Sequence, residues 1–203
     1  MDKNTEIITD VDGNVYHTIS IGTQVWMVEN LKTTKYNDGT EIPFIFDTAE
    51  AWYELNSPGY CWYDDNENYM ETTGALYNWH TLNTGKLCPK GWHIPTDKEW
   101  SILAEFLGGE IVAGGKMKAI GTEFWSSPNA GATNLSGFTA LYGSFRGKSG
   151  FIPLSNGTLL FWSGTAYDDV DAWAWYLRFD SEALGRNHGG KYHGFSVRCL
   201  KDG

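Results

Sequence analysis

The chain lacks the features that indicate a membrane protein or a nucleic-acid-binding protein. Its 203 residues contain no apolar run near the length of about 20 residues that a membrane-spanning helix needs, and the polar N-terminus shows no signal peptide. Basic residues are few, since 15 Lys and Arg stand against 25 Asp and Glu, which gives a net charge of −10. An acidic surface repels phosphate backbones, so we expect no nucleic-acid partner.

Motifs of the common catalytic and zinc sites are also missing. The sequence has no Gly-x-Ser-x-Gly nucleophile elbow, no phosphate-binding P-loop and no His-Glu-x-x-His metal motif. Its three cysteines are Cys61, Cys88 and Cys199; none of them forms a Cys-x-x-Cys pair, and no histidine lies at zinc-finger spacing. An odd number of cysteines allows one disulfide and one free thiol. We therefore expect neither enzymatic activity nor a zinc site.

The acidic loops do not follow a calcium-binding pattern. Residues 64–68 begin like an EF-hand loop, but Tyr69 and Ala75 stand where that loop needs its glycine and its final glutamate. Residues 10–14 fail in the same way. The acidic stretch 168–171 would hold an ion only weakly, and a solvated loop is the simpler interpretation. We assign no metal ligand and no cofactor, and leave open a structural calcium ion elsewhere in the domain.

Aromatic residues and glycine are abundant. The chain has 10 Trp, 11 Tyr, 10 Phe and 24 Gly, a composition typical of many short strands joined by turns rather than of a helical bundle. The rings have two interpretations. They fill a loop-rich core, or some of them are exposed and stack on the faces of sugars.

The clearest single element is a helix over residues 96–107. Thr96 is a typical N-cap residue, and Glu99 stands three residues later, where its carboxylate can complete a capping box. The apolar residues that follow recur at helical spacing and share one face: Trp100, Leu103, Ala104 and Leu107. Two glycines at 108–109 end the helix, because glycine adopts the left-handed C′ conformation without strain.

The remaining pattern predicts an α+β chain in which strands dominate. Residues 1–9 are expected to be an N-terminal tail and residues 10–203 a single domain. Further helices are predicted at 47–57 and 74–82, and the stretch 108–157 is rich in glycine, serine and asparagine. Strands are predicted at 15–21, 24–28, 59–63, 137–141, 143–146, 159–163, 172–179 and 194–200, with a turn at 188–190.

Five ordered motifs resemble one protein family. They are residues 12–16 (DGNVY), 21–31 (IGTQVWMVENL), 74–79 (GALYNW), 87–100 (LCPKGWHIPTDKEW) and 194–199 (GFSVRC). Together they resemble the Fibrobacter succinogenes major paralogous domain, over roughly residues 10–201. That family occurs mainly in secreted proteins and surface lipoproteins of the Bacteroidetes and Fibrobacteres, so the resemblance implies an exported protein at or outside the cell surface. It implies no defined biochemical activity.

A more distant likeness concerns the fold. Residues 95–100, the glycines at 108–109 and a final Gly-Phe-x-x-Arg strand resemble the formylglycine-generating enzymes, which share the C-type lectin-like fold. The resemblance implies short helices packed on antiparallel sheets, and a disulfide between a helix region and the last strand. Cys88 and Cys199 match that arrangement, so we expect a Cys88–Cys199 bridge and an oxidising compartment. Cys61 is left as a buried thiol, and the reactive cysteine pair of those enzymes has no counterpart near the C-terminus.

In lectin-like folds the long loops before the last strands usually form the binding surface. Here the resemblance implies a ligand face within residues 163–192. The candidate ligand-binding residues in it are Tyr167, Asp168, Asp169, Asp171, Trp173, Arg186, His188 and Tyr192. Alternation along the strand 172–179 puts Trp173 and Trp175 on one face. We expect Trp175 in the core and Trp173, which is nearer the loop, to be the exposed ring.

Three functions stay open at this point. The leading hypothesis is a non-enzymatic binding module at the cell surface, or a secreted one, with a glycan or a protein as its ligand. The second is a structural module of a larger surface assembly. The third is an enzyme related to the formylglycine-generating oxidases, which a reactive Cys61 thiol in a cleft would favour. The argument for binding rests on likeness of fold and on aromatic richness, and a fold alone does not determine a function.

Overall fold

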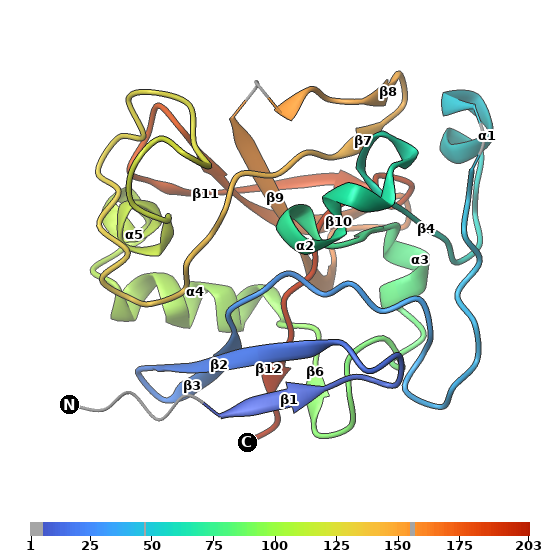
Figure 1. Cartoon of the computed structure of the whole chain (residues 1–203), viewed down its shortest axis with the longest axis horizontal. Helices are drawn as coiled ribbons and strands as arrows, with labels where there is room; N and C mark the ends of the chain where they lie inside the picture. The colour runs from blue at the N-terminus through green and yellow to red at the C-terminus, as the bar shows by residue number, and fades with distance from the viewer. Residues whose placement is uncertain (1–5, 47, 155–156) are drawn as a thin grey trace.

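A computed structural model describes residues 6–46, 48–154 and 157–203 and shows a mixed α+β chain with antiparallel sheets (Figure 1). The strands are β1 (Ile7–Thr9), β2 (Val15–Ile21), β3 (Gln24–Met27), β4 (Tyr60–Cys61), β5 (Leu76–Tyr77), β6 (Trp92–His93), β7 (Arg146–Gly147), β8 (Gly150–Phe151), β9 (Thr158–Ala166), β10 (Asp171–Arg178), β11 (Leu184–Gly190) and β12 (Leu200–Lys201). The helices are α1 (Ala49–Tyr53), α2 (Met70–Thr73), α3 (Trp79–Leu82), α4 (Asp97–Phe106) and α5 (Glu110–Met117). Among the described residues no helix is long and apolar enough to cross a membrane.

The largest sheet joins the two ends of the chain. Its strand order is β1-β2-β3-β12-β6, and all of its pairs are antiparallel. Leu200 of β12 pairs with Trp26 on one side and with His93 on the other. The last strand therefore lies between the N-terminal hairpin and the segment before α4, and both β1 and the C-terminus lie at the lower edge of the molecule in Figure 1.

The start of the chain corrects one expectation and confirms another. Residues 7–9 form β1, which pairs with β2 from Ile7–His17 to Thr9–Val15, so the expected tail over 1–9 is wrong for them. Residues 1–5 lie outside the described part of the chain. The predicted hairpin is confirmed, because β2 and β3 pair directly across the turn at 22–23.

A three-stranded antiparallel sheet, in the order β11-β10-β9, carries the C-terminal part of the chain. β10 lies in the middle, with Trp173 opposite His188 and Trp175 opposite Arg186 on β11. The predicted turn at 188–190 is wrong, because these residues complete β11. Consecutive glycines commonly indicate a turn, but here Gly189 and Gly190 pair with Ala172 and Asp171 at the start of β10.

The helix α4 confirms the sequence interpretation, and the helix after it was missed. The Thr96 hydroxyl accepts from the backbone N–H of Glu99, and the Glu99 carboxylate accepts from that of Thr96, which is a complete capping box. No helix is predicted at α5, which lies in the glycine-rich stretch 108–157 and contains Gly114 and Gly115. A Cβ on Gly114 would lie 2.2 Å from the carbonyl oxygen of Ala183, so close packing against the segment before β11 requires glycine in this helix.

The predicted helix 74–82 is wrong in its first half. Leu76 and Tyr77 form β5, paired with β4, and Asn78 then caps the short helix α3 through a bond from the backbone N–H of Thr81. The predicted last strand over 194–200 is only partly present. Phe195 and Ser196 make single bridges to Tyr77 and Phe161, and the regular strand begins at residue 200. α1 covers the middle of the predicted helix 47–57, of which residue 47 lies outside the described residues.

Most tryptophans belong to the core, which favours the packing interpretation for them. The buried side chains form two main clusters, one of which contains Phe195, Val197 and Cys199 and the other Leu200. The fully buried tryptophans are Trp26, Trp52, Trp100, Trp125, Trp162 and Trp175. Three cations are also buried: Lys118, Arg146 and Arg198. Lys118 donates to the carbonyl oxygens of Ala130, Arg178 and Ser181, at 2.8 to 2.9 Å, so its ammonium joins the loop at residue 130 to the end of β10 and the turn after it.

The structure contains the expected Cys88–Cys199 disulfide. It joins the segment before β6 to the residue before β12, with a Cα–Cα distance of 6.0 Å. Cys61 is a buried free thiol, as predicted. Burial raises the pKa of Cys61 to about 12, so at neutral pH it is a protonated thiol and not a nucleophilic thiolate.

Candidate functional site

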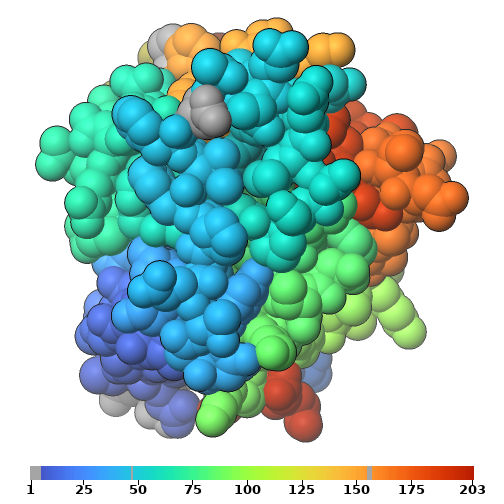
Figure 2. Space-filling view, turned by 90° about the vertical axis from the view of Figure 1, so that its right-hand side faces the viewer, coloured from blue at the N-terminus to red at the C-terminus, as the bar shows by residue number. Residues whose placement is uncertain are grey.

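The turn between β9 and β10 and the facing part of β11 bring most of the predicted residues together. Tyr167, Asp168 and Asp169 lie in the turn, Asp171 begins β10, and His188 lies on β11. The hairpin projects from the body of the molecule, as the orange lobe at the right of Figure 2. We call this surface the β9–β10 tip.

A stack of three rings forms the apolar part of the tip. The ring of Tyr167 stacks on that of His188 with centroids 4.2 Å apart and an interplanar angle of 8°. It also meets the ring of Trp173 edge to face, at 4.9 Å and 84°. His188 covers one face of Tyr167, yet 49% of the tyrosine remains exposed. The neighbouring rings therefore hold Tyr167 in place while leaving much of its surface to solvent.

Arg186 connects the rings to the central helix. Its guanidinium carbon lies 3.5 Å from the ring centroid of Trp173, and its Nε and Nη2 donate to Asp97 at 2.8 and 2.5 Å. Asp97 is the first residue of α4 and also accepts from Nε1 of Trp175 at 3.1 Å. This bidentate pair raises the pKa of Arg186 and fixes the plane of its guanidinium. Because Arg186 covers one face of it, Trp173 is half-buried rather than freely exposed.

The acidic residues of the tip are engaged in its own turn. Oδ1 of Asp168 accepts from the backbone N–H of Asp171 and of Val170, at 2.7 and 2.8 Å, and these bonds lower the pKa of Asp168. Lys191 donates from Nζ to the carbonyl oxygens of Asp168 and Asp169, at 2.8 and 2.9 Å. Within the described ranges, no three His, Cys, Asp or Glu side chains are grouped so that they could hold a metal ion.

The remaining carboxylate orients the histidine of the stack. Nδ1 of His188 lies 2.6 Å from Oδ2 of Asp171, and the two side chains are 40% and 25% exposed. Asp171 therefore fixes the plane of the ring on which Tyr167 stacks. The contacts of His188 are therefore to one carboxylate and to two aromatic rings, those of Tyr167 and Trp173.

Tyr192 does not belong to the tip, which corrects the predicted set. Its ring packs over Gly190, where a Cβ would lie 2.3 Å from it, and meets Tyr53 edge to face at 4.6 Å. It also stacks on His193 at 4.2 Å. Tyr192 follows the end of β11, and there the chain turns toward α1 rather than toward Tyr167.

Sequence reasoning missed two residues that build the tip. In the sequence Asp97 is only one residue of the motif over 87–100, and its pairing with Arg186 spans 89 positions. Lys191 was not selected, although it closes the acidic turn. No local sequence pattern predicts either contact. The contact of Asp97 depends on how the three-stranded sheet packs against α4, and the contact of Lys191 depends on how β11 lies beside the β9–β10 turn. The prediction for Trp175 was right, since its side chain is fully buried.

Comparison with known proteins gives one match. Neither the curated proteins nor the solved structures include a match to this chain. The family model described as the Fibrobacter succinogenes major domain matches residues 19–201, which includes α4, the disulfide and the whole β9–β10 tip. The chain belongs to the Fibrobacter succinogenes major domain family.

Proposed function

We propose that the chain is a non-enzymatic binding module of C-type lectin-like architecture and that the β9–β10 tip binds a glycan. The observation that carries the proposal is the ring of Tyr167, which is half exposed and yet held between His188 and Trp173. A flat ring in a fixed orientation offers a platform for the C–H face of a pyranose. Since the ring is already ordered, little conformational entropy is lost when a sugar binds.

Polar groups around the ring supply directional contacts. His188 is exposed on β11, and its ring can meet sugar hydroxyls beside Tyr167. The charges near the tip are four carboxylates against two cations: Asp97, Asp168, Asp169 and Asp171, with Arg186 and Lys191. This local balance favours a neutral saccharide over an acidic one at the tip.

Other features support a location outside the cell. The Cys88–Cys199 disulfide persists in oxidising compartments and is rare in the reducing cytosol. We therefore propose that the protein acts at the cell surface or is secreted. A protein ligand at the same tip is the closest alternative, because exposed Tyr and Arg are also common at protein interfaces.

The enzymatic and structural alternatives have less support. An oxidase of the formylglycine-generating type would need a reactive thiol, whereas Cys61 is fully buried and its pKa is raised to about 12. A purely structural module would have no use for an ordered and exposed aromatic cluster at a projecting hairpin.

A glycan array tests the proposal directly. The wild-type protein and Tyr167→Ala should be compared, with Tyr53→Ala as the matched control, because Tyr53 is also exposed but lies beside Tyr192. We expect the wild type and the control to bind the same neutral glycans, and Tyr167→Ala to lose them. An array and a surface-protein pull-down that both return nothing specific would count against any binding function of the tip.

A further inference from the structure

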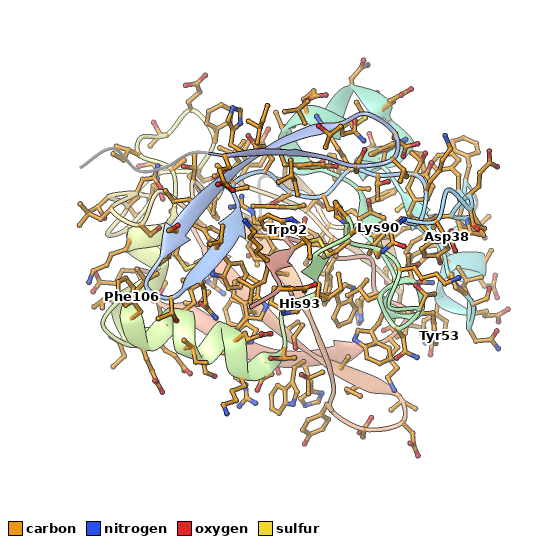
Figure 3. All side chains as sticks on the ribbon, turned by 90° about the horizontal axis from the view of Figure 1, so that it is seen from below. Asp38, Tyr53, Lys90, Trp92, His93 and Phe106 are labelled. Atoms are coloured by element: carbon orange, nitrogen blue, oxygen red, sulfur yellow. A yellow bond between two sulfur atoms is a disulfide. The ribbon has the colours of Figure 1, made fainter. Side chains whose placement is uncertain are left out.

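Two hollows share the side chain of Trp92, which is labelled in Figure 3, as a wall. The first has a volume of about 300 Å³ and lies between β1, the loop at 33–37 and the loop at 87–92. The second, of about 270 Å³, lies between the end of α3, the segment 87–94 and Gly164 of β9. Leu87 and Trp92 line both of them. We call the two hollows together the Trp92 groove.

Backbone hydrogen bonds and core packing hold Trp92 in place. Its backbone pairs with Lys201 of β12, and its N–H donates to the carbonyl oxygen of Pro89 at 3.0 Å. The ring is half-buried and packs against the core cluster that contains the Cys88–Cys199 disulfide. One part of the ring therefore belongs to the core, and the other part is available at the wall of the groove.

The opposite wall is fixed by hydrogen bonds to the same loop. The backbone N–H of Asn37 donates to the carbonyl oxygen of Lys86 at 2.8 Å, and Nδ2 of Asn37 donates to that of Cys88 at 2.9 Å. Figure 2 shows the light-blue and green segments that carry these residues side by side. The groove is therefore formed before any ligand binds, which limits the entropic cost of binding.

The carboxylates near the first hollow already have hydrogen-bond or ion-pair partners, whereas the ammonium of Lys90 has no ion-pair partner among the described residues. Both oxygens of Asp10 accept hydrogen bonds, from two backbone N–H groups, the Asn14 amide and the Tyr16 hydroxyl. Lys35 lies 3.0 Å from the carboxylate of Asp12. Lys90 is exposed, and among residues 6–46, 48–154 and 157–203 it has no ion-pair partner. One unpaired ammonium that lines the same hollow as a tryptophan ring suits a carboxylate, whereas a phosphate site would have an arginine fork or several amides.

The bordering strands argue for a sugar chain rather than for a peptide. Peptides commonly extend a sheet by pairing with an exposed strand edge. The strands at this groove, β1 and β6, have only three and two residues, so an added strand would gain few backbone hydrogen bonds. Hollows that share an aromatic wall, with amides and hydroxyls at their rims, instead match successive sugar rings.

We propose that the Trp92 groove is a second binding site, separate from the β9–β10 tip, for an oligosaccharide that carries carboxylates, such as a uronic acid chain. One sugar ring packs against Trp92 while the carboxylate of a neighbouring unit pairs with Lys90. The tip and the groove then select different chemistry, since the tip favours a neutral saccharide.

Calorimetric titration with tetragalacturonic acid and with its methyl ester, at low ionic strength, tests this site. We expect the acid to bind more tightly than the ester. Lys90→Gln should lower the affinity for the acid two- to fivefold, which is the range expected for a solvent-exposed ion pair, and should leave the affinity for the ester unchanged. Lys98→Gln, which removes another exposed lysine, should change neither affinity. Trp92→Ala should weaken both ligands at least tenfold, and Trp92→Phe, which keeps a flat ring, should retain most of the binding.

Several results would overturn the proposal. No binding of either ligand at millimolar concentration is one, and equal binding of acid and ester that Lys90→Gln does not alter is another. A glutamate-rich peptide that binds and depends on Trp92 would make the groove a peptide site. If Tyr167→Ala abolishes binding of the acid, the acid binds at the tip and not at the groove. The experiment therefore distinguishes failure of the proposal for the groove from failure of the proposal for the tip. If Trp92→Ala does not fold, Trp92→Phe and Lys90→Gln still decide the question.

Discussion

Removal of the Cys88–Cys199 disulfide should cost about 5 kcal/mol of the free energy of unfolding. The two cysteines are 111 positions apart, and closing a loop of that length removes a large amount of entropy from the unfolded chain. Both cysteines are buried, and Cys199 lies one residue before β12, the strand that holds the N-terminal hairpin to β6. Since a domain is commonly stable by about 5–15 kcal/mol, the loss is a large fraction of the total.

Urea unfolding, followed by tryptophan fluorescence, measures this loss in the double variant Cys88→Ala/Cys199→Ala. With a denaturant slope of roughly 2–3 kcal/mol/M, the midpoint should fall by about 2 M. Reducing agent should destabilise the wild type to a similar degree and leave the double variant unchanged, because the remaining Cys61 is not in a bridge. A loss below about 1 kcal/mol, or a free Cys88 thiol in non-reducing mass spectrometry, would refute the reasoning.

Three further substitutions test other contacts. Arg186→Ala should lower the free energy of unfolding by about 1 kcal/mol or less, because the ion pair is partly exposed, and should increase acrylamide quenching of Trp173. Lys118→Met should cost about 3 kcal/mol in urea unfolding, since it removes a buried ammonium that donates hydrogen bonds to three carbonyl oxygens, whereas Lys98→Met on the exposed face of α4 should change little. Burial alone would lower the pKa of His93, but hydrogen bonds to the carboxylates of Asp202 and Glu99 raise this pKa on balance. Protonated His93 therefore stabilises the fold fully below pH about 6.5, and this stabilisation is lost as the pH rises through the raised pKa. His93→Gln should remove this pH dependence, and imidazole NMR titration of the wild type should give a pKa above that of a free histidine.

Local chemistry made part of the fold predictable. The capping box of Thr96 and Glu99 involves groups only three residues apart, so the sequence alone identifies it. The β2–β3 hairpin follows from alternation around a short turn. The Cys88–Cys199 bridge was predicted from family likeness, and the structure contains it.

The features that were missed depend on contacts between distant segments. α5 contains Gly114 and Gly115, which have low helix propensity, yet the backbone of a neighbouring loop comes too close for any larger residue. β11 ends in glycines that resemble a turn until they pair with β10. At the candidate site, Tyr167 and Trp173 were predicted to lie on one surface. Arg186, which packs on the ring of Trp173, is held by Asp97 at the start of α4, and no local pattern indicates that contact.

An NMR titration of the isotope-labelled protein with the best neutral glycan from the array tests the binding role of the β9–β10 tip most directly. We expect the amide signals of residues 167–173 and 186–191 to shift together, with little change at Trp92, and the shifts to disappear in Tyr167→Ala but not in Tyr53→Ala. Saturating shifts confined to another surface, or an unchanged affinity in Tyr167→Ala, would contradict a binding function for the tip.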